Sequence, residues 1–374
     1  MCSSDLDKLR LTPGPPDNPD EGYRSRFDHE DETASAGYYS VFLKDCGVLA
    51  ELTSTRRAGF HRYTFPEAEN SRIIIDLGHQ IGTYRPEEKA EIKIINNYII
   101  EGVRSTRSGK IWFVAEFNKP FAYYGTFDTD YRTPESDAGI FPYKNGEKGE
   151  RIGAFVYYRT GENEQVLVKV GISYTGIDGA RKNLAGEIPD WDFDRVKNKA
   201  REVWNHELSR IKIEGSTEEK KEIFYTALYH SLLAQYISQD VAGEYRGPDE
   251  KIHVAEGYDY YGSFSCWDTY RSQHPLLTLV AGEHVNDFIK SIESKTREYG
   301  WLPAQHFNNV FGESMVGDHL VPVIVDAFMK GYRDFDFDFL YDAMRTKALE
   351  LPSTPVPRSE EHTSELQSRQ SISY

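Results

Sequence analysis

The densest group of residues able to do chemistry lies in Gly262–Pro275, which reads GSFSCWDTYRSQHP. Trp267 offers a flat apolar face on which a sugar ring can stack, and Asp268 offers acceptors for sugar hydroxyls. Arg271 adds hydrogen-bond donors near an expected helix start. The structural alternative is that Asp268 caps a helix beginning at Thr269, with Arg271 as its ion-pair partner. The segment therefore indicates either a carbohydrate contact or a helix cap.

A second polar group follows the element Gly300–Pro303 (GWLP) and occupies Phe311–His319 (FGESMVGDH). Glu313, Asp318 and His319 lie there in a glycine-containing loop before an apolar helix. These residue types can ligate a metal, but their spacing matches no established metal motif. Asp318 is equally able to cap the helix that starts at His319.

Glycosidases need two carboxylates on either side of the bond that they cleave, and Asp268 and Glu313 are one conceivable pair. This pairing is weak evidence, because the chain holds 60 acidic residues and some pair of carboxylates can always be chosen. A third polar stretch, Tyr23–Val41, is typical of a loop that leads into a strand. The chain contains no phosphate-binding glycine loop, HExxH or GxSxG motif.

The net charge of the chain disfavours two classes of binding partner, nucleic acids and anionic membranes. The formal net charge is −16, whereas nucleic acids and anionic membranes require a basic face. No apolar run is long enough to span a membrane. Outside the first residues, Cys46 and Cys266 are the only cysteines, too few for a disulfide framework. The chain length predicts two domains.

Residues 37–172 are predicted to be an antiparallel β-sandwich, because short apolar segments alternate with turn residues and no helical pattern intervenes. The expected strands are 39–43, 48–55, 59–63, 72–77, 91–95, 98–107, 111–118, 122–127, 153–158 and 165–172.

The pattern becomes helical after Pro189. A linker helix is predicted over 194–211, and Ser216 and Glu219 have the spacing of a capping box for the next helix. Apolar stripes at helical spacing follow, and the predicted helices succeed one another without strands. Their members are Phe224, Ala227, Leu228, Ser231 and Leu232; Val285, Phe288, Ile289 and Ile292; and Leu320, Val323, Ile324, Ala327 and Phe328, with a last helix over 337–349. This order predicts a sandwich followed by an (α/α) toroid that is cut partway.

The residue order at both ends of the chain matches a translated synthetic oligonucleotide. Arg358–Ser368 back-translates to a common sequencing adapter, and Met1–Leu6 to the reverse complement of the same adapter. We therefore expect 1–6 and 358–374 to be artefacts that make few contacts with the rest of the chain. The alternative is a pair of polar, disordered tails.

These motifs together resemble glycoside hydrolase family 92. The family carries a block S-T-F-S-x-W-D-T-F-R-x-x-H-P, similar to Gly262–Pro275, and then a G-W-L-P element, similar to Gly300–Pro303. Its next element, G-N-E-x-x-C-M-x-G-x-H, is matched in part by Gly312–His319, and its sandwich carries segments similar to Tyr23–Val41 and Ala50–Pro66. Cys266 stands where an apolar residue is expected.

The resemblance implies domains at 7–190 (sandwich), 191–215 (linker helix) and 216–357 (first part of the (α/α)6 catalytic domain). It implies an inverting, calcium-dependent exo-α-mannosidase, with α-1,2 linkages favoured, that trims N-glycans or mannans. Trp267 and Asp268 are the expected contacts to the terminal mannose, followed by Glu313 and His319. The family's catalytic acid and base, and most of its calcium ligands, are expected outside 7–357. The chain alone is then expected to be inactive. A secreted or periplasmic bacterial location is expected.

Two alternatives belong to other classes. One is a non-catalytic carbohydrate-binding or scaffold protein built from a sandwich and helices. The other is an enzyme similar to the glycoside phosphorylases, which needs phosphate and no calcium. A longer sequence separates the first alternative from the mannosidase, since only the enzyme continues into blocks that hold an acid and a base.

Overall fold

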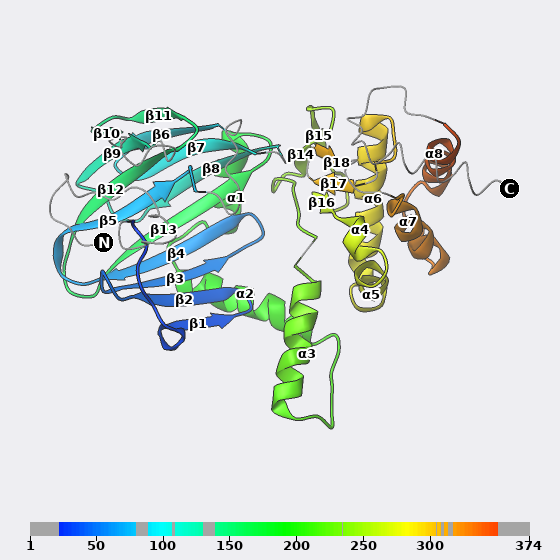
Figure 1. Ribbon diagram of the computed structural model, residues 1–374, viewed down its shortest axis with the longest axis horizontal. Coiled ribbons are helices and arrows are strands. Elements are labelled where there is room, and N and C mark those ends of the chain that lie inside the picture. Colours follow the sequence, from blue (N-terminus) through cyan, green and yellow to red (C-terminus); the bar gives the residue numbers. More distant parts are fainter. Residues whose placement is uncertain are drawn as a thin grey trace. The chain divides into compact units, whose positions relative to one another are not determined.

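The computed structural model describes residues 22–79, 89–106, 109–129, 139–233, 235–303, 305–307, 310–312 and 317–350. It divides between Trp204 and Asn205 into a sheet unit and a helical unit (Figure 1). The division falls inside the predicted linker of 191–215. The predicted artefacts at 1–6 and 358–374 lie outside the described residues.

The sheet unit is built from two antiparallel sheets (Figure 1). The larger sheet has the strand order β1-β2-β3-β4-β13-β8-β7-β6-β11, and the smaller has the order β10-β9-β12-β5. The strands are β1 (Glu32–Ser35), β2 (Tyr38–Leu43), β3 (Val48–Ser54), β4 (Ala58–Phe65), β5 (Ala68–Asp76), β6 (Ala90–Asn96), β7 (Ile99–Thr106), β8 (Gly109–Phe117), β9 (Tyr123–Asp128), β10 (Gly139–Pro142), β11 (Gly146–Gly149), β12 (Ile152–Thr160) and β13 (Glu164–Ser173).

The core of this unit lies between the two sheets. Ile92 and Ile100 of the larger sheet are fully buried against Ala154 and Val156 of the smaller one. Alternate residues of a strand point to opposite faces, so the alternation in the sequence selects which side chains enter this core. The predicted sandwich is confirmed, and the ten expected strands are all present.

The outer face of the larger sheet is covered by α1 (Ile177–Glu187) and by the start of α2 (Phe193–Leu208). Helix α1 packs directly on β13 at Gly171, where a Cβ would lie 2.4 Å from the carbonyl oxygen of Ala180. The absence of a side chain at Gly171 therefore allows the close approach of α1. The sequence did not predict α1, and it predicted α2 within a few residues.

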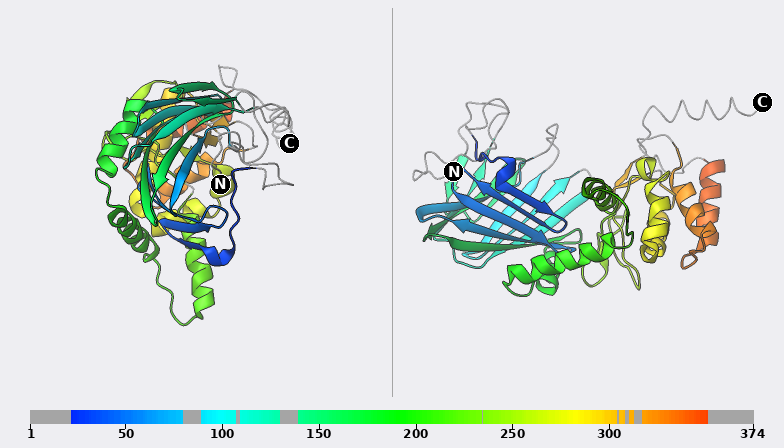
Figure 2. Two further views of the ribbon diagram at one scale, coloured as in Figure 1. Left: turned by 90° about the vertical axis from the view of Figure 1, so that its left-hand side faces the viewer. Right: turned by 90° about the horizontal axis from the view of Figure 1, so that it is seen from below.

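The helical unit contains α3 (Glu218–Ser231), α4 (Cys266–Thr269), α5 (Gln273–Val280), α6 (Gly282–Tyr299), α7 (Leu320–Met329) and α8 (Phe337–Leu349). Helices α6 and α7 lie side by side with α8 beyond them (Figure 2). The predicted stripe of α6, from Val285 to Ile292, is buried in this core. Gly300 ends α6 with φ +78°, a conformation that suits glycine.

The expectation of helices without intervening strands was wrong. Five short strands form small antiparallel sheets between the helices: β14 (Glu244–Arg246), β15 (Ile252–Val254), β16 (Ser263–Phe264), β17 (Gln305–Phe307) and β18 (Val310–Gly312). Each has at most three residues, which is too short for alternation to be visible in the sequence.

The start of α3 also differs from the prediction. Its N-cap is Thr217, whose hydroxyl accepts from the backbone N–H of Lys220, so the Ser216 capping box is wrong by one residue. Of the predicted stripe on α3, Leu228 alone is buried.

Candidate functional site

The Trp267–Asp268 pair lies at the start of α4, directly after β16. Phe264 and Cys266 are fully buried and anchor this segment in the helical core. Trp267 is 44% exposed, and Asp268 is also exposed. The short helix thus directs Cys266 inward and the pair outward, so Trp267 is not a core residue.

The helix-cap alternative for Asp268 is wrong. The N-cap of α4 is Ser265, and Asp268 is the third residue of the helix. The Ser265 hydroxyl donates to Oδ2 of Asp268 over 2.5 Å. Arg271 is not an ion-pair partner of Asp268 among the described residues, and its Nε instead donates to the Tyr270 hydroxyl. Asp268 therefore keeps an exposed carboxylate that is held by one hydroxyl.

The second polar group is brought next to this helix. Strand β16 pairs with β17, which pairs with β18, so the chain before Trp267 is bound to the chain that precedes Glu313. The ring of Tyr270, the C-cap of α4, contacts the ring of His319 at a centroid distance of 4.5 Å. Glu313 lies outside the described residues. The structure therefore places His319 near the end of α4.

His319 is oriented by its own loop. Gly317 has φ +116°, and a Cβ there would come within 2.4 Å of the His319 ring. His319 is the N-cap of α7 but makes no side-chain cap hydrogen bond. Asp318 does not cap α7 as its alternative assignment required, and its Oδ1 lies 3.3 Å from Nζ of Lys347.

Lys295 supports the chain just before the site and was not singled out from the sequence. It is 0% exposed, and its Nζ donates to the carbonyl oxygens of Tyr261 and Gly262. Ser291, one turn earlier on α6, accepts from the backbone N–H of Tyr261 over 2.9 Å. The available signal was that Lys295 continues the apolar spacing of Phe288 and Ile292. A lysine on such a stripe indicates a buried polar contact.

Cys266, which precedes Trp267 in the chain, and His274 form a buried pair. The Cys266 sulfur lies 3.9 Å from Nε2 of His274. Burial raises the pKa of the Cys266 thiol to about 12, so the cysteine acts as a small apolar residue. Burial also lowers the pKa of His274 from 6.5 to about 4.

Replacing His274 by leucine should weaken the dependence of stability on pH. Because the folded pKa is lower than the unfolded one, the unfolded chain binds more protons between about pH 4 and 6.5. The contribution of neutral His274 is therefore complete above this range and is lost as the pH falls through it. The loss between pH 7 and pH 5 is about 2 kcal/mol at 1.4 kcal/mol per pKa unit.

The free energy of unfolding by urea, measured at both pH values, should fall less in His274→Leu than in the unchanged chain. His206→Leu, at an exposed position of α2, is the matched control. An unchanged pH dependence in His274→Leu would contradict the burial argument.

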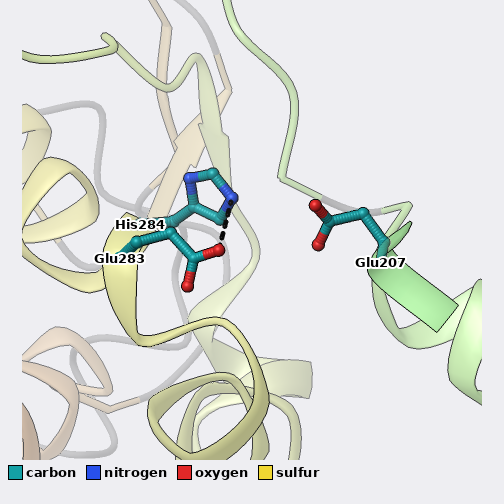
Figure 3. A group of neighbouring side chains, drawn as sticks. All are labelled: Glu207, Glu283 and His284. Atoms are coloured by element: carbon teal, nitrogen blue, oxygen red, sulfur yellow. Dashed lines mark ion pairs between the residues drawn. The ribbon is translucent and has the colours of Figure 1, made fainter. Parts of the chain in front are cut away.

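A carboxylate–histidine group is formed by Glu207, at the end of α2, and by Glu283 and His284, at the start of α6 (Figure 3). Figure 3 shows Glu207 directed toward the other two side chains, with an ion pair between Glu283 and His284. Arg210 donates to both carboxylates, to Oε2 of Glu207 over 2.7 Å and to Glu283. The guanidinium already supplies the positive charge, so this group does not require a metal.

The predicted polar loop of Tyr23–Val41 is confirmed only up to Asp31, because β1 and the start of β2 lie within the same range. It contains a 3-10 turn at His29–Asp31 and then enters the β1–β2 pair. The Tyr23 hydroxyl donates to Oδ2 of Asp76 over 2.9 Å, which attaches the loop to β5.

Comparison with known proteins agrees with this architecture. Residues 3–173 match the glycosyl hydrolase family 92 N-terminal domain, and residues 179–374 match the glycosyl hydrolase family 92 catalytic domain. A family 92 α-mannosidase structure from Bacteroides thetaiotaomicron is 33% identical with a TM-score of 0.83 over 93% of this chain and 47% of that chain. The same enzyme has been solved in complex with mannoimidazole.

Two further proteins are similar. An inverting mannosidase of family 92 from Bacteroides thetaiotaomicron VPI-5482 is 26% identical, with a TM-score of 0.77 over 88% of this chain and 43% of that chain. An uncharacterized secreted glycosidase of Arthroderma benhamiae is 25% identical over 83% of this chain and 38% of its own length. The chain thus spans less than half the length of these relatives.

Proposed function

The chain belongs to glycosyl hydrolase family 92, and from this premise we propose that it is part of an inverting exo-α-mannosidase in which Trp267 and Asp268 bind the terminal mannose. The observation that carries the proposal is the outward placement of both side chains on a helix whose other face is buried. An exposed indole packs on the apolar face of a sugar, and an exposed carboxylate accepts from its hydroxyls.

The role proposed for the pair is binding, not proton transfer. An inverting glycosidase needs an acid and a base far enough apart to admit a water molecule. Asp268 accepts from Ser265, and its backbone N–H is bonded to the Ser265 carbonyl, so it is held as a fixed acceptor. We propose that the acid and the base lie outside 7–357. Glu313 and His319 are proposed as further sugar contacts, of which His319 lies near α4.

Calcium is proposed for the complete enzyme, but the described residues do not fit it. Calcium takes six to eight oxygen ligands. Arg210 already pairs with the carboxylates of Glu207 and Glu283, and the second mixed group, Asp249, His253 and Glu298, contains a nitrogen and few oxygens. We therefore assign no step to calcium within this chain.

The natural substrate is proposed to be a mannose-containing glycan, either an N-glycan or a mannan, with α-1,2 linkages favoured. A secreted or periplasmic bacterial location is proposed on the family resemblance, and one curated relative is described as secreted. None of the described helices is both long and apolar enough to cross a membrane.

The complete protein that contains this chain should release mannose from α-1,2-mannobiose, and the first product seen by proton NMR should be the β anomer. Inversion requires this outcome, because water attacks the face opposite the leaving group. The α-1,3 and α-1,6 isomers, assayed in parallel, test the linkage preference.

Early appearance of the α anomer would contradict inversion. Binding of mannobiose without any release would favour the carbohydrate-binding alternative, and release that depends on inorganic phosphate would favour the phosphorylase alternative.

A further inference from the structure

A second carboxylate–histidine group lies in the helical unit, in the hairpin of β14 and β15 and at the end of α6. It consists of Asp249, His253 and Glu298, and their ligand atoms all lie within 4.8 Å of one another. Nε2 of His253 lies 2.9 Å from Oδ1 of Asp249, and Nδ1 lies 4.0 Å from Oε1 of Glu298. We infer that this group is a binding site for a divalent metal ion of the zinc class.

The carboxylate of Glu298 has one oxygen without a partner. The Glu298 side chain is 9% exposed, and its Oε1 accepts a hydrogen bond from the Tyr245 hydroxyl. Its Oε2 is fully buried and accepts from no described residue. A buried carboxylate oxygen is costly unless it is hydrogen-bonded, paired with a charge or bound to a metal. The orphaned Oε2 therefore indicates that a ligand completes the group.

The three side chains converge beside Gly247. A Cβ on Gly247 would lie 2.5 Å from Oε2 of Glu298, 2.8 Å from Oδ1 of Asp249 and 2.9 Å from Cδ2 of His253. The absence of a side chain at Gly247 therefore leaves a space that all three side chains border.

The donor set indicates the kind of ion. Imidazole nitrogen and carboxylate oxygen are both zinc ligands, and three protein ligands leave a fourth position open, whereas calcium prefers only oxygen. Tetrahedral ligand atoms lie roughly 3.3 Å apart when each bond is about 2.0 Å. Nε2 of His253 lies 2.9 Å from Oδ1 of Asp249, near this value, and one ligand atom from each of the three residues lies within 4.8 Å of the others, so small side-chain rotations bring the atoms into position.

The two mixed groups of the helical unit differ in their positive charge. In the Glu207–Glu283–His284 group, Arg210 contacts both carboxylates. In the Asp249–His253–Glu298 group, the cationic contact of Asp249 is Lys251, whose Nζ lies at 3.4 Å on a side chain 77% exposed. Lys295 is directed to the carbonyls of Tyr261 and Gly262. The second group therefore has room for a cation where the first already has one.

Zinc binding by the full chain tests the site. After dialysis against a chelator, the chain should bind one equivalent of Zn²⁺ in calorimetry and melt at a higher temperature with Zn²⁺. Glu298→Gln and His253→Gln, which keep the size of each side chain, should each lower the affinity at least about tenfold. Co²⁺ in place of Zn²⁺ should give the visible absorption of a four-coordinate ion.

His284→Gln, in the group whose carboxylates pair with Arg210, is the matched control and should leave the affinity unchanged. Asp249→Asn, at a side chain more exposed than that of Glu298, provides a second test if Glu298→Gln does not fold. Equal zinc affinity in the unchanged chain and in both folded site variants would overturn the inference. Equal loss in His284→Gln, or binding of Ca²⁺ in preference to Zn²⁺, would overturn it as well.

Discussion

Expressed alone, the 374-residue chain should release no measurable mannose from α-mannosides, with or without added calcium. The reason is that a general acid or base contributes about 10²–10⁴-fold to the rate, and both are proposed to lie outside this chain. We expect a rate at least about a thousandfold below that of the complete protein, measured by enzymatic detection of free mannose.

A folding control is needed to show that the inactive chain is folded. Circular dichroism should show both strand and helix content, and the chain should melt cooperatively, so that inactivity is not the result of unfolding. Robust turnover by the purified chain would contradict the proposal and would make Asp268, Glu313 or their neighbours catalytic.

The sheet unit was predictable because its strands are long enough to show their pattern. Strands such as β4 and β13 place alternate side chains in the core, and Gly or Asp residues separate the strands along the chain. The edge strands β1, β10 and β11 were missed, since each has only four residues and no buried side chain. Helix α1 was missed because Gly179 and Gly186 lower its helix propensity, and packing on β13 compensates.

The helical unit was predictable where an apolar stripe is buried along one helix. Helix α6 has such a stripe. The predicted range of α8, residues 337–349, also agrees with the structure. The short strands β14 to β18 were not predictable from periodicity, because each has at most three residues, and β16 in addition pairs with β17, which lies far from it along the chain.

The candidate site was likewise predictable only in part, from its residue types and not from its tertiary contacts. The types of Trp267 and Asp268 indicated a sugar contact, and their exposure supports that interpretation over a core residue and a cap. The contact of Tyr270 with His319 joins segments that no local pattern connects. The convergence of Asp249 and Glu298 likewise depends on the tertiary fold.

In the complete protein, Asp268→Ala should lower kcat/KM for α-1,2-mannobiose at least about tenfold. The exposed carboxylate is proposed to accept hydrogen bonds from hydroxyls of the terminal mannose, and a hydrogen bond to a charged group contributes about 1.5–3 kcal/mol. A tenfold change corresponds to about 1.4 kcal/mol. The substitution leaves the N-cap of α4 in place, because that residue is Ser265.

The most direct test of the Trp267–Asp268 proposal is therefore kcat/KM of Asp268→Ala beside Asp342→Ala, which removes an exposed carboxylate from α8. Equal melting temperatures would show that both variants are folded. We predict a decrease of at least about tenfold for Asp268→Ala and no change for Asp342→Ala. A decrease of less than about tenfold for Asp268→Ala, with the protein folded, would contradict a sugar-binding role for Asp268.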